Sequence, residues 1–271
     1  MNKFESIFRV KHPIIGMIHV QALPGTPNYQ GDSNFVIDKA LQEARLYKQL
    51  GIDALMLENM HDVPYQKNGV GAEITSMMTL IASTIKQETK LPLGIQILAG
   101  ANKEALAVAK AAQLEFIRAE GFVFGHVADE GYIDSQAADL LRYRKQIDAA
   151  HIAVFTDIKK KHSSHAITAD VNLVETAHAA EFFLSDGLII TGKQTGFETD
   201  IDEIKAVKSH TNLPVIIGSG ISIDNVAAYL PISDAMIVGS YFKKDGFWKN
   251  DLEASRIKGF MAKVNELRQK T

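Results

Sequence analysis

The sequence contains no cysteine among its 271 residues. This absence excludes disulfide bonds, thiolate nucleophiles and thiolate-ligated zinc, and it is typical of proteins that work in a reducing compartment. The chain also lacks a basic excess, because 29 Lys and Arg stand against 32 Asp and Glu for a formal net charge of −3. Nucleic-acid binding requires a basic surface, so we expect no nucleic-acid partner.

Long hydrophobic runs are absent as well. The longest apolar stretches have about six residues, whereas a bilayer-spanning helix needs about 20. The first 13 residues mix acidic and basic side chains and contain no apolar core of a signal peptide. We therefore expect a soluble, cytoplasmic protein with no membrane span.

Hydrophobic residues nevertheless make up 46% of the chain, which is enough for a large core. Short runs rich in Ile and Val alternate with longer amphipathic segments. The predicted strands are 14–19, 54–58, 93–98, 116–118, 152–157, 188–191, 215–218 and 235–238. The predicted helices are 35–50, 72–89, 102–113, 135–147, 170–184, 200–210, 223–230 and 251–270.

Eight strand–helix units in series predict an α/β fold, a single (β/α)₈ TIM barrel over residues 1–271. Continuous hydrophobicity, as in Val215-Ile216-Ile217, is typical of strands buried on both faces of a parallel sheet. No Pro- or Ser-rich linker divides the chain. A doubly wound open sheet has the same alternation, but eight units closed by a long helix favour the barrel. We expect Gly51 to end the first helix, and Asn102 and Ser135 to cap two others.

Glycine loops follow the last two predicted strands. Gly218, Ser219 and Gly220 come after the seventh strand, and Gly239 and Ser240 after the eighth. Glycines let a backbone approach a phosphate closely, and a helix predicted after the first loop would point its N–H groups at an anion. We predict that these five residues bind phosphate at the C-terminal face. The alternative is that each glycine only makes a tight turn.

The segment 155–162 ends the fifth predicted strand in a run of charges. Asp157, Lys159 and Lys161 would share one face if the strand continued that far. A carboxylate beside an ammonium can transfer protons or stabilise an enolate, so we predict catalytic roles for Asp157 and Lys159. The alternative is a solvated basic loop, which is our interpretation of Lys160.

Polar residues follow the other strands at the end of the barrel where active sites of this fold lie. His19 and Glu58 end the first two strands, and we predict acid–base roles for both. The predicted substrate-binding residues are Gln21, Asn59, Gln96, Arg118, Glu120, His162 and Thr191. Two alternatives stay open. His19 could be a buried structural histidine, and Glu58 could pair with Arg118.

A divalent metal is a further hypothesis. Glu58, His61, Asp157 and His162 are all of ligand type, but no His-x-His or His-Glu-x-x-His spacing assembles them, and we predict no cofactor.

Two loops complete the set of candidates. Lys193 follows the sixth strand, where a lysine could form a Schiff base, although the glycines around it favour solvent. His126 and Asp129 lie in a loop, 125–131, that is either a lid over the site or packing decoration.

Taken together, these segments resemble the BtpA/SgcQ family. The resemblance covers nearly the whole chain. It rests on PIIGMIH (13–19), LPG (23–25), EN (58–59), GAE (71–73), DLLRYR (139–144), DIKKKH (157–162), TG (191–192 and 195–196), GSG (218–220) and VGSYFKKDG (238–246). The chain departs from the family pattern after the third strand, where LAGAN (98–102) replaces a more polar turn.

The resemblance implies a ribulose-phosphate-binding barrel and no particular reaction. One branch of the family is named for photosystem I biogenesis, and another is encoded with sugar-phosphotransferase genes. The resemblance implies site positions at His19, Glu58, Asn59, Asp157, Lys159, His162, Ser219 and Ser240.

Three functions follow from these observations. The favoured one is an enzyme that acts on a small phosphorylated metabolite by isomerisation, epimerisation, aldol cleavage or decarboxylation. The second is a non-catalytic assembly factor, whose outer helices would expose an apolar face. The third is a metal-dependent hydrolase or lyase. Barrels of this size often pair as homo-oligomers, but nothing in the sequence adds to that general tendency.

Overall fold

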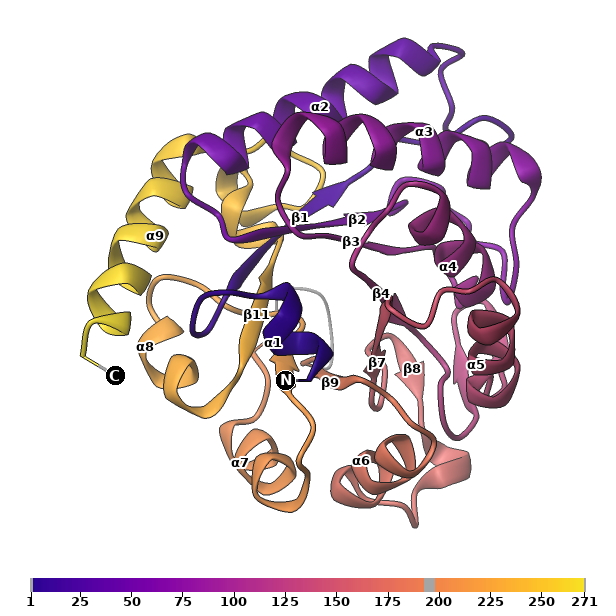
Figure 1. Cartoon of the computed structure of the whole chain (residues 1–271), viewed down its shortest axis with the longest axis vertical. Helices are drawn as coiled ribbons and strands as arrows, with labels where there is room; N and C mark the ends of the chain where they lie inside the picture. Colours follow the sequence, from indigo (N-terminus) through magenta and orange to yellow (C-terminus); the bar gives the residue numbers. More distant parts are fainter. Residues whose placement is uncertain (1, 193–197, 271) are drawn as a thin grey trace.

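A computed structural model describes residues 2–192 and 198–270. Eight parallel strands close into a barrel in the order β1-β11-β10-β9-β7-β4-β3-β2, which confirms the predicted barrel (Figure 1). The strands are β1 (Ile14–His19), β2 (Ala54–Glu58), β3 (Leu93–Gln96), β4 (Phe116–Ala119), β7 (Ala153–Asp157), β9 (Gly187–Ile190), β10 (Val215–Ile217) and β11 (Ala235–Val238).

Helices surround this barrel, as Figure 1 shows. They are α2 (Ser33–Gln49), α3 (Ala72–Thr89), α4 (Asn102–Ala111), α5 (Ala137–Gln146), α6 (Leu173–Phe182), α7 (Ile201–His210), α8 (Val226–Tyr229) and α9 (Ala254–Arg268). Among the residues described, no helix has the length and hydropathy needed to cross a bilayer.

Helix ends test three of the predictions. Gly51 follows α2 with a φ of +79°, as expected of a glycine that ends a helix. The two predicted caps are wrong. Ala101 precedes α4, and the Asn102 amide instead donates to the Glu120 carbonyl at 2.7 Å. Gln136 precedes α5 in place of Ser135.

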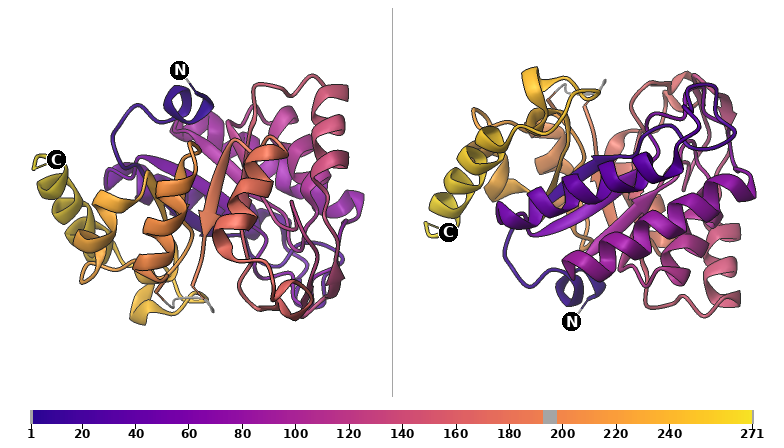
Figure 2. Two further views of the ribbon diagram at one scale, coloured as in Figure 1. Left: turned by 90° about the horizontal axis from the view of Figure 1, so that it is seen from below. Right: turned by 90° about the horizontal axis from the view of Figure 1, so that it is seen from above.

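A short N-terminal helix, α1 (Lys3–Ile7), was not predicted because five residues are too few to show a helical period. Asn2 and Glu5 form a capping box that stabilises it. Figure 2 shows α1 at one end of the barrel, and the strands β9–β11 run away from it. Ile7 and Phe8 pack into the barrel interior. The interior cluster consists of Ile7, Phe8, Ile15, Met17, Ala54, Met56, Phe116, Ala153, Phe155, Ile189, Ile216, Ala235 and Ile237.

Ile7 and Phe8 form a plug at this end of the barrel, and Phe8 makes aromatic contacts with residues of the barrel strands. Its ring centroid lies 5.7 Å from that of Phe116 and 6.3 Å from that of Phe155. Such pairs contribute about 1 kcal/mol each beyond the area they bury. We expect Phe8→Leu, which removes both pairs, to lower the free energy of unfolding by about 2 kcal/mol. Phe35→Leu is the control, because Phe35 is exposed. If the two variants unfolded at the same urea concentration, Phe8 would not act as a plug of the barrel.

A second, three-stranded antiparallel sheet is formed by β5 (His126–Ala128), β6 (Gly131–Ile133) and β8 (Ser163–Ser164). The segment 125–131, predicted to be either a lid or packing decoration, therefore belongs to a β-hairpin. Val127 in this hairpin pairs with Ser164, which belongs to the segment that follows β7. The two loops after β4 and β7 are thus joined by backbone hydrogen bonds.

Alternation along the barrel strands determines which side chains meet at the C-terminal end. Along β1, Ile15 and Met17 belong to the interior cluster, and His19 follows at the same period of two. The register pairs His19 with Glu58, and Glu58 with Gln96. The apolar interior of the barrel therefore gives way to a polar layer at the strand ends.

Candidate functional site

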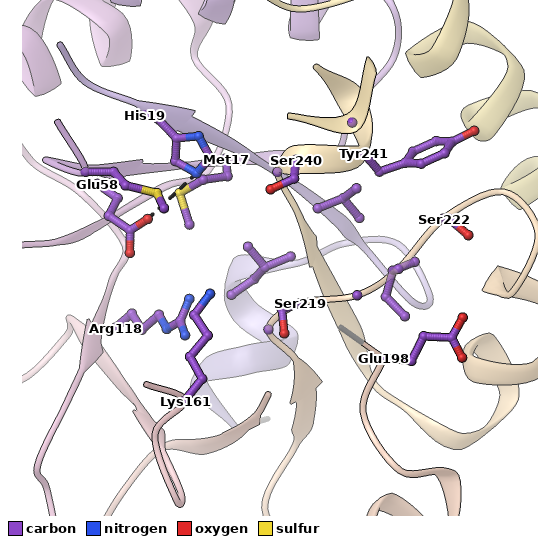
Figure 3. Close-up of a pocket in the computed structure, with 18 of the residues that line it drawn as sticks. Met17, His19, Glu58, Arg118, Lys161, Glu198, Ser219, Ser222, Ser240 and Tyr241 are labelled. Carbon is purple, nitrogen blue, oxygen red and sulfur yellow. Dashed lines mark ion pairs between the residues drawn. The ribbon is translucent and has the colours of Figure 1, made fainter. Parts of the chain in front are cut away.

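A cavity of about 230 Å³ opens at the C-terminal ends of the strands (Figure 3). Its lining consists of Met17, His19, Glu58, Met60, Arg118, Lys161, Glu198, Gly218, Ser219, Gly220, Ile221, Ser222, Ile237, Val238, Gly239, Ser240, Tyr241, Gly246 and Arg256. Figure 3 shows the serines of the two glycine loops on one side and the charged ends of Glu58, Arg118 and Lys161 on the other. A second cavity of about 450 Å³ adjoins the first and shares Glu58, Arg118 and Lys161 with it.

The two glycine loops line one wall of this cavity, where the sequence predicted a phosphate site. A β-carbon at Gly218 would lie 2.7 Å from Ile189 Cγ2, and Gly220 has a φ of +77°. Glycine is therefore required here by packing and backbone geometry, which also fits the alternative of simple turns. Ser219 Oγ accepts a hydrogen bond from the Gly192 N–H at 3.2 Å.

The helix expected after this loop differs from the prediction. It begins at Val226, not Ile223, and has four residues. The Ser222 N–H donates to Asn225 Oδ1 at 2.9 Å, and the Asp224 N–H donates to Ser222 Oγ. These donors are used within the chain, so an anion would have to be bound by the loops themselves.

Charged residues that the sequence did not single out also line the cavity. Arg256 lies in the first turn of α9, and its Nε donates to the Tyr241 carbonyl at 2.6 Å. Glu198 accepts from Asn225 Nδ2 at 2.9 Å. Both residues lie far along the chain from the loops they adjoin, and only the closed barrel brings them to one wall.

Arg118 and Asp157 form a buried ion pair beneath the cavity. Arg118 Nε and Nη2 each donate to one Asp157 oxygen at 2.8 Å, which is the bidentate geometry. Burial alone would lower the pKa of Arg118, but Asp157 raises it above its ordinary value. Arg118 lines the cavity and Asp157 does not. The hypothesis that Arg118 pairs with Glu58 is wrong.

Glu58 lies beside His19 instead. His19 Nε2 lies 3.8 Å from Glu58 Oε2, and Nδ1 lies 3.4 Å from the Trp248 carbonyl. Burial, reinforced by the positive charge of Lys243, lowers the pKa of His19 well below its ordinary value. The imidazole is therefore neutral near pH 7, so it can accept a proton at one nitrogen and donate from the other.

The three lysines after Asp157 point in different directions, because β7 ends at Asp157 and its alternation ends with it. Lys159 has a φ of +54° and its ammonium donates to the Val171 carbonyl at 2.6 Å, outside the cavity. Lys160 is half-buried and lies 3.2 Å from Glu120, so the interpretation of Lys160 as solvated is wrong. Lys161 lines the cavity instead.

Several predicted substrate-binding residues support the loops instead of lining the main cavity. The Asn59 side chain donates to Asp62 at 2.8 Å and accepts from the Leu98 N–H at 2.7 Å. Gln96 donates to Glu120 at 2.8 Å. These contacts tie the loops after β2, β3 and β4 together.

The remaining predicted residues lie around the cavity. Glu120 and His162 line the adjoining cavity. Gln21 lies beside His61, in a separate hollow of about 310 Å³. The Thr191 hydroxyl is buried, and within the described part of the chain it has no hydrogen-bond partner.

The metal hypothesis requires several ligands to converge. Across residues 2–192 and 198–270, no three His, Asp or Glu side chains lie close enough together to hold a metal ion. The predicted set of Glu58, His61, Asp157 and His162 is therefore not assembled. Lys193, the candidate for a Schiff base, lies outside the described residues.

Comparison with known proteins places this site in a wider context. An uncharacterised protein of Caenorhabditis elegans, named as mitochondrial, is 48% identical over 261 residues, which are 94% of each chain. The photosystem I biogenesis protein BtpA of Synechocystis is 30% identical and covers 98% of this chain and 92% of its own. Phosphoribosyl anthranilate isomerase of Thermus thermophilus shares the fold with a TM-score of 0.58, at 14% identity over 94% of this chain and 99% of its own.

The family predicted from the motifs is confirmed by these matches. The family model covers residues 10–266, nearly the whole barrel. It includes both glycine loops, the Arg118–Asp157 pair and Lys161. The chain belongs to the BtpA family.

Proposed function

We propose that this protein is an enzyme that acts by acid–base chemistry on a small phosphorylated metabolite. One observation carries the proposal. A single cavity has two glycine loops on one wall and Glu58, His19, Arg118 and Lys161 on the other. Loops after the last two strands are the usual phosphate site of this fold, and acid–base groups at the strand ends are its usual catalysts.

The phosphate end of the ligand would lie against Gly218–Gly220 and Gly239-Ser240. The Ser219 and Ser240 side chains and the backbone N–H groups of these loops supply donors, and Arg256 supplies a positive charge. Glu198 lies at the same wall and opposes an anion, but it is already hydrogen-bonded to Asn225. Serine, glycine and arginine together favour a phosphate over a neutral group.

The reacting end would face Glu58 and His19. Glu58 can act as a base, and neutral His19 beside it can pass the proton on. Arg118, with Asp157 fixing its orientation, places a permanent positive charge where an enolate oxygen would form. Isomerisation, epimerisation, aldol cleavage and decarboxylation all use this combination. The resemblance in fold to a phosphoribosyl isomerase supports this group of reactions.

A non-catalytic assembly role is the second candidate. Phe182, Phe183 and Leu184 at the end of α6 are exposed, which is the apolar outer surface that such a role requires. A relative named for photosystem I biogenesis points the same way. Substitutions can distinguish the two functions. An assembly factor should keep its function when cavity residues are changed and lose it when Phe182 is replaced by a polar residue.

Ser240 offers the sharpest test of phosphate binding. It lines both cavities, and a carboxylate here would face the bound phosphate. Two like charges about 4 Å apart repel by about 1–4 kcal/mol depending on the dielectric, so Ser240→Asp should weaken binding about tenfold or more. Ser240→Asn is the matched neutral control. Binding of inorganic phosphate and sugar phosphates would be measured by calorimetry and thermal shift. Equal affinities in the two variants would contradict the assigned phosphate site.

A further inference from the structure

Lys161 differs from the two lysines that precede it. Lys159 donates to a backbone carbonyl, and Lys160 lies within 4.0 Å of two carboxylates, those of Glu120 and Glu130. Lys161 lines the cavity, and within residues 2–192 and 198–270 no carboxylate lies within 4.0 Å of its ammonium. Figure 3 shows its side chain running beside that of Arg118, with both ends directed into the cavity.

The surroundings of Lys161 lower the pKa of its ammonium group below the ordinary value. Burial lowers the pKa of Lys161, and the neighbouring charge of Arg118 lowers it further. The carboxylates of Glu58, Asp157 and Glu120 act in the opposite direction without reversing the shift. Both carboxylate oxygens of Asp157 already accept hydrogen bonds from Arg118. By contrast, the carboxylates beside Lys160 raise its pKa despite burial, so Lys160 stays charged.

We propose that Lys161 is the nucleophile of the site and forms an imine with the carbonyl carbon of a phosphorylated aldehyde or ketone. A desolvated lysine beside a second cation is a recognised arrangement for an amine nucleophile. The proposal rests on the proposed function, because the glycine loops hold the phosphate while Lys161 meets the carbonyl. It narrows the substrate class to compounds that carry both groups.

The covalent step balances without any further reactant. The Lys161 nitrogen forms a bond to the carbonyl carbon, and the C–O π electrons move to oxygen to give a carbinolamine. The C–O bond then breaks, and the oxygen leaves as water with the two protons that the amine carried. Glu58 and His19 lie on the same cavity and can carry these protons from nitrogen to oxygen.

An imine at this position determines what the site can do next. Once protonated, the imine withdraws electrons from an adjacent C–H or C–C bond, so that bond breaks more easily. Aldol cleavage, isomerisation through the neighbouring carbon and loss of carbon dioxide from a β-keto acid all follow from it. Phosphoryl transfer gains nothing from an imine, so the proposal excludes it as the reaction of this site.

Reductive trapping tests this proposal on the full-length protein. Pyridoxal 5′-phosphate carries an aldehyde and a phosphate, and its imines are fixed by borohydride and located by peptide mass spectrometry. Each unit by which a lysine pKa falls raises the neutral fraction near pH 7 about tenfold. We expect labelling of Lys161 to exceed that of an exposed lysine such as Lys103, because its lowered pKa leaves more neutral amine and the glycine loops would hold the phosphate of the reagent in the same cavity. Excess inorganic phosphate should suppress it.

Three variants serve as controls. Lys161→Met removes the amine, and Lys161→Arg keeps the charge but has no nucleophilic amine, so both should lose the label. Lys159→Arg should keep it, because Lys159 lies outside the cavity and an arginine can still donate to Val171. Circular dichroism would check that each variant is folded. The label in the unmodified protein provides a measurement that depends on no variant.

The outcomes separate this proposal from the proposed function. If dihydroxyacetone phosphate stabilises the protein but borohydride labels only exposed lysines, the imine is wrong and the phosphate site stands. If unphosphorylated pyridoxal labels Lys161 equally well and phosphate has no effect, the imine stands and the phosphate site is wrong. If neither binding nor labelling occurs, both proposals are overturned.

Discussion

Asp157→Asn should lower the free energy of unfolding by about 3–5 kcal/mol, which is the usual cost of removing one partner from a buried ion pair. Both side chains of the Arg118–Asp157 pair are almost completely buried, at 4% and 1% exposure. The amide cannot balance the guanidinium charge, and Arg118 would remain desolvated and unpaired. Urea unfolding followed by circular dichroism would measure the change.

Two further variants decide whether the charge is responsible. Replacing both partners, as in Arg118→Met with Asp157→Leu, removes the unpaired charge and should recover most of the lost stability. Glu88→Gln breaks an exposed pair with Arg45 and should leave the free energy of unfolding nearly unchanged, because solvent screens such a pair. If the double variant were less stable than Asp157→Asn, side-chain packing and not charge would explain the loss.

The same pair shows what strand periodicity could predict. Eight hydrophobic runs in order indicate the barrel, and alternation along β1, β2, β3 and β4 places His19, Glu58, Gln96 and Arg118 at its C-terminal end. Strand periodicity cannot predict, however, which nearby carboxylate pairs with Arg118. Glu58, Glu120 and Asp157 all lie near Arg118, and the barrel geometry selects Asp157 although it is 39 residues away.

The lysine run shows where such reasoning fails. The prediction extended the alternation of β7 to Lys159 and Lys161, but the strand ends at Asp157 and Lys159 adopts a left-handed backbone conformation. Hydrogen bonds between β5 and β8 then fix the path of the loop. Which of three adjacent lysines faces the cavity is therefore set by a contact with residues about 35 positions earlier, which no local pattern contains.

Buried polar residues at strand ends are also difficult to interpret from sequence. Asn59 and Gln96 sit at strand ends, where the sequence suggested ligand contacts, but their side chains hold loop backbones and other side chains in place. A strand end of a barrel needs such residues because the loops bury backbone N–H groups that must find acceptors. Residue type and position alone do not separate these supporting roles from substrate binding.

Protonation of three buried histidines should cost the protein stability as the pH falls from 6.5 to 4. Burial lowers the pKa of both His61 and His126 to about 4, and it lowers the pKa of His19 well below its ordinary value. In the unfolded chain these histidines titrate near 6.5, so between the two values the unfolded chain binds more protons. The stability contributed by the neutral rings is therefore complete above about pH 6.5 and is lost as the pH falls.

His126 gives the cleanest measurement of this effect. His126 belongs to β5 of the small sheet, and its side chain is buried. Its Nε2 has no hydrogen-bond partner among the described residues, and His165 and Lys160 oppose a positive charge there. A shift from 6.5 to about 4 corresponds to about 2 kcal/mol lost between pH 7.5 and 5. His126→Gln cannot titrate, so urea unfolding of this variant should lose about 2 kcal/mol less over that range. The same exchange at the exposed His151 is the matched control. If the free energy of unfolding changed equally with pH in the unmodified protein and in His126→Gln, the prediction would be wrong. That result would mean that His126 binds protons equally well in the folded and unfolded chain.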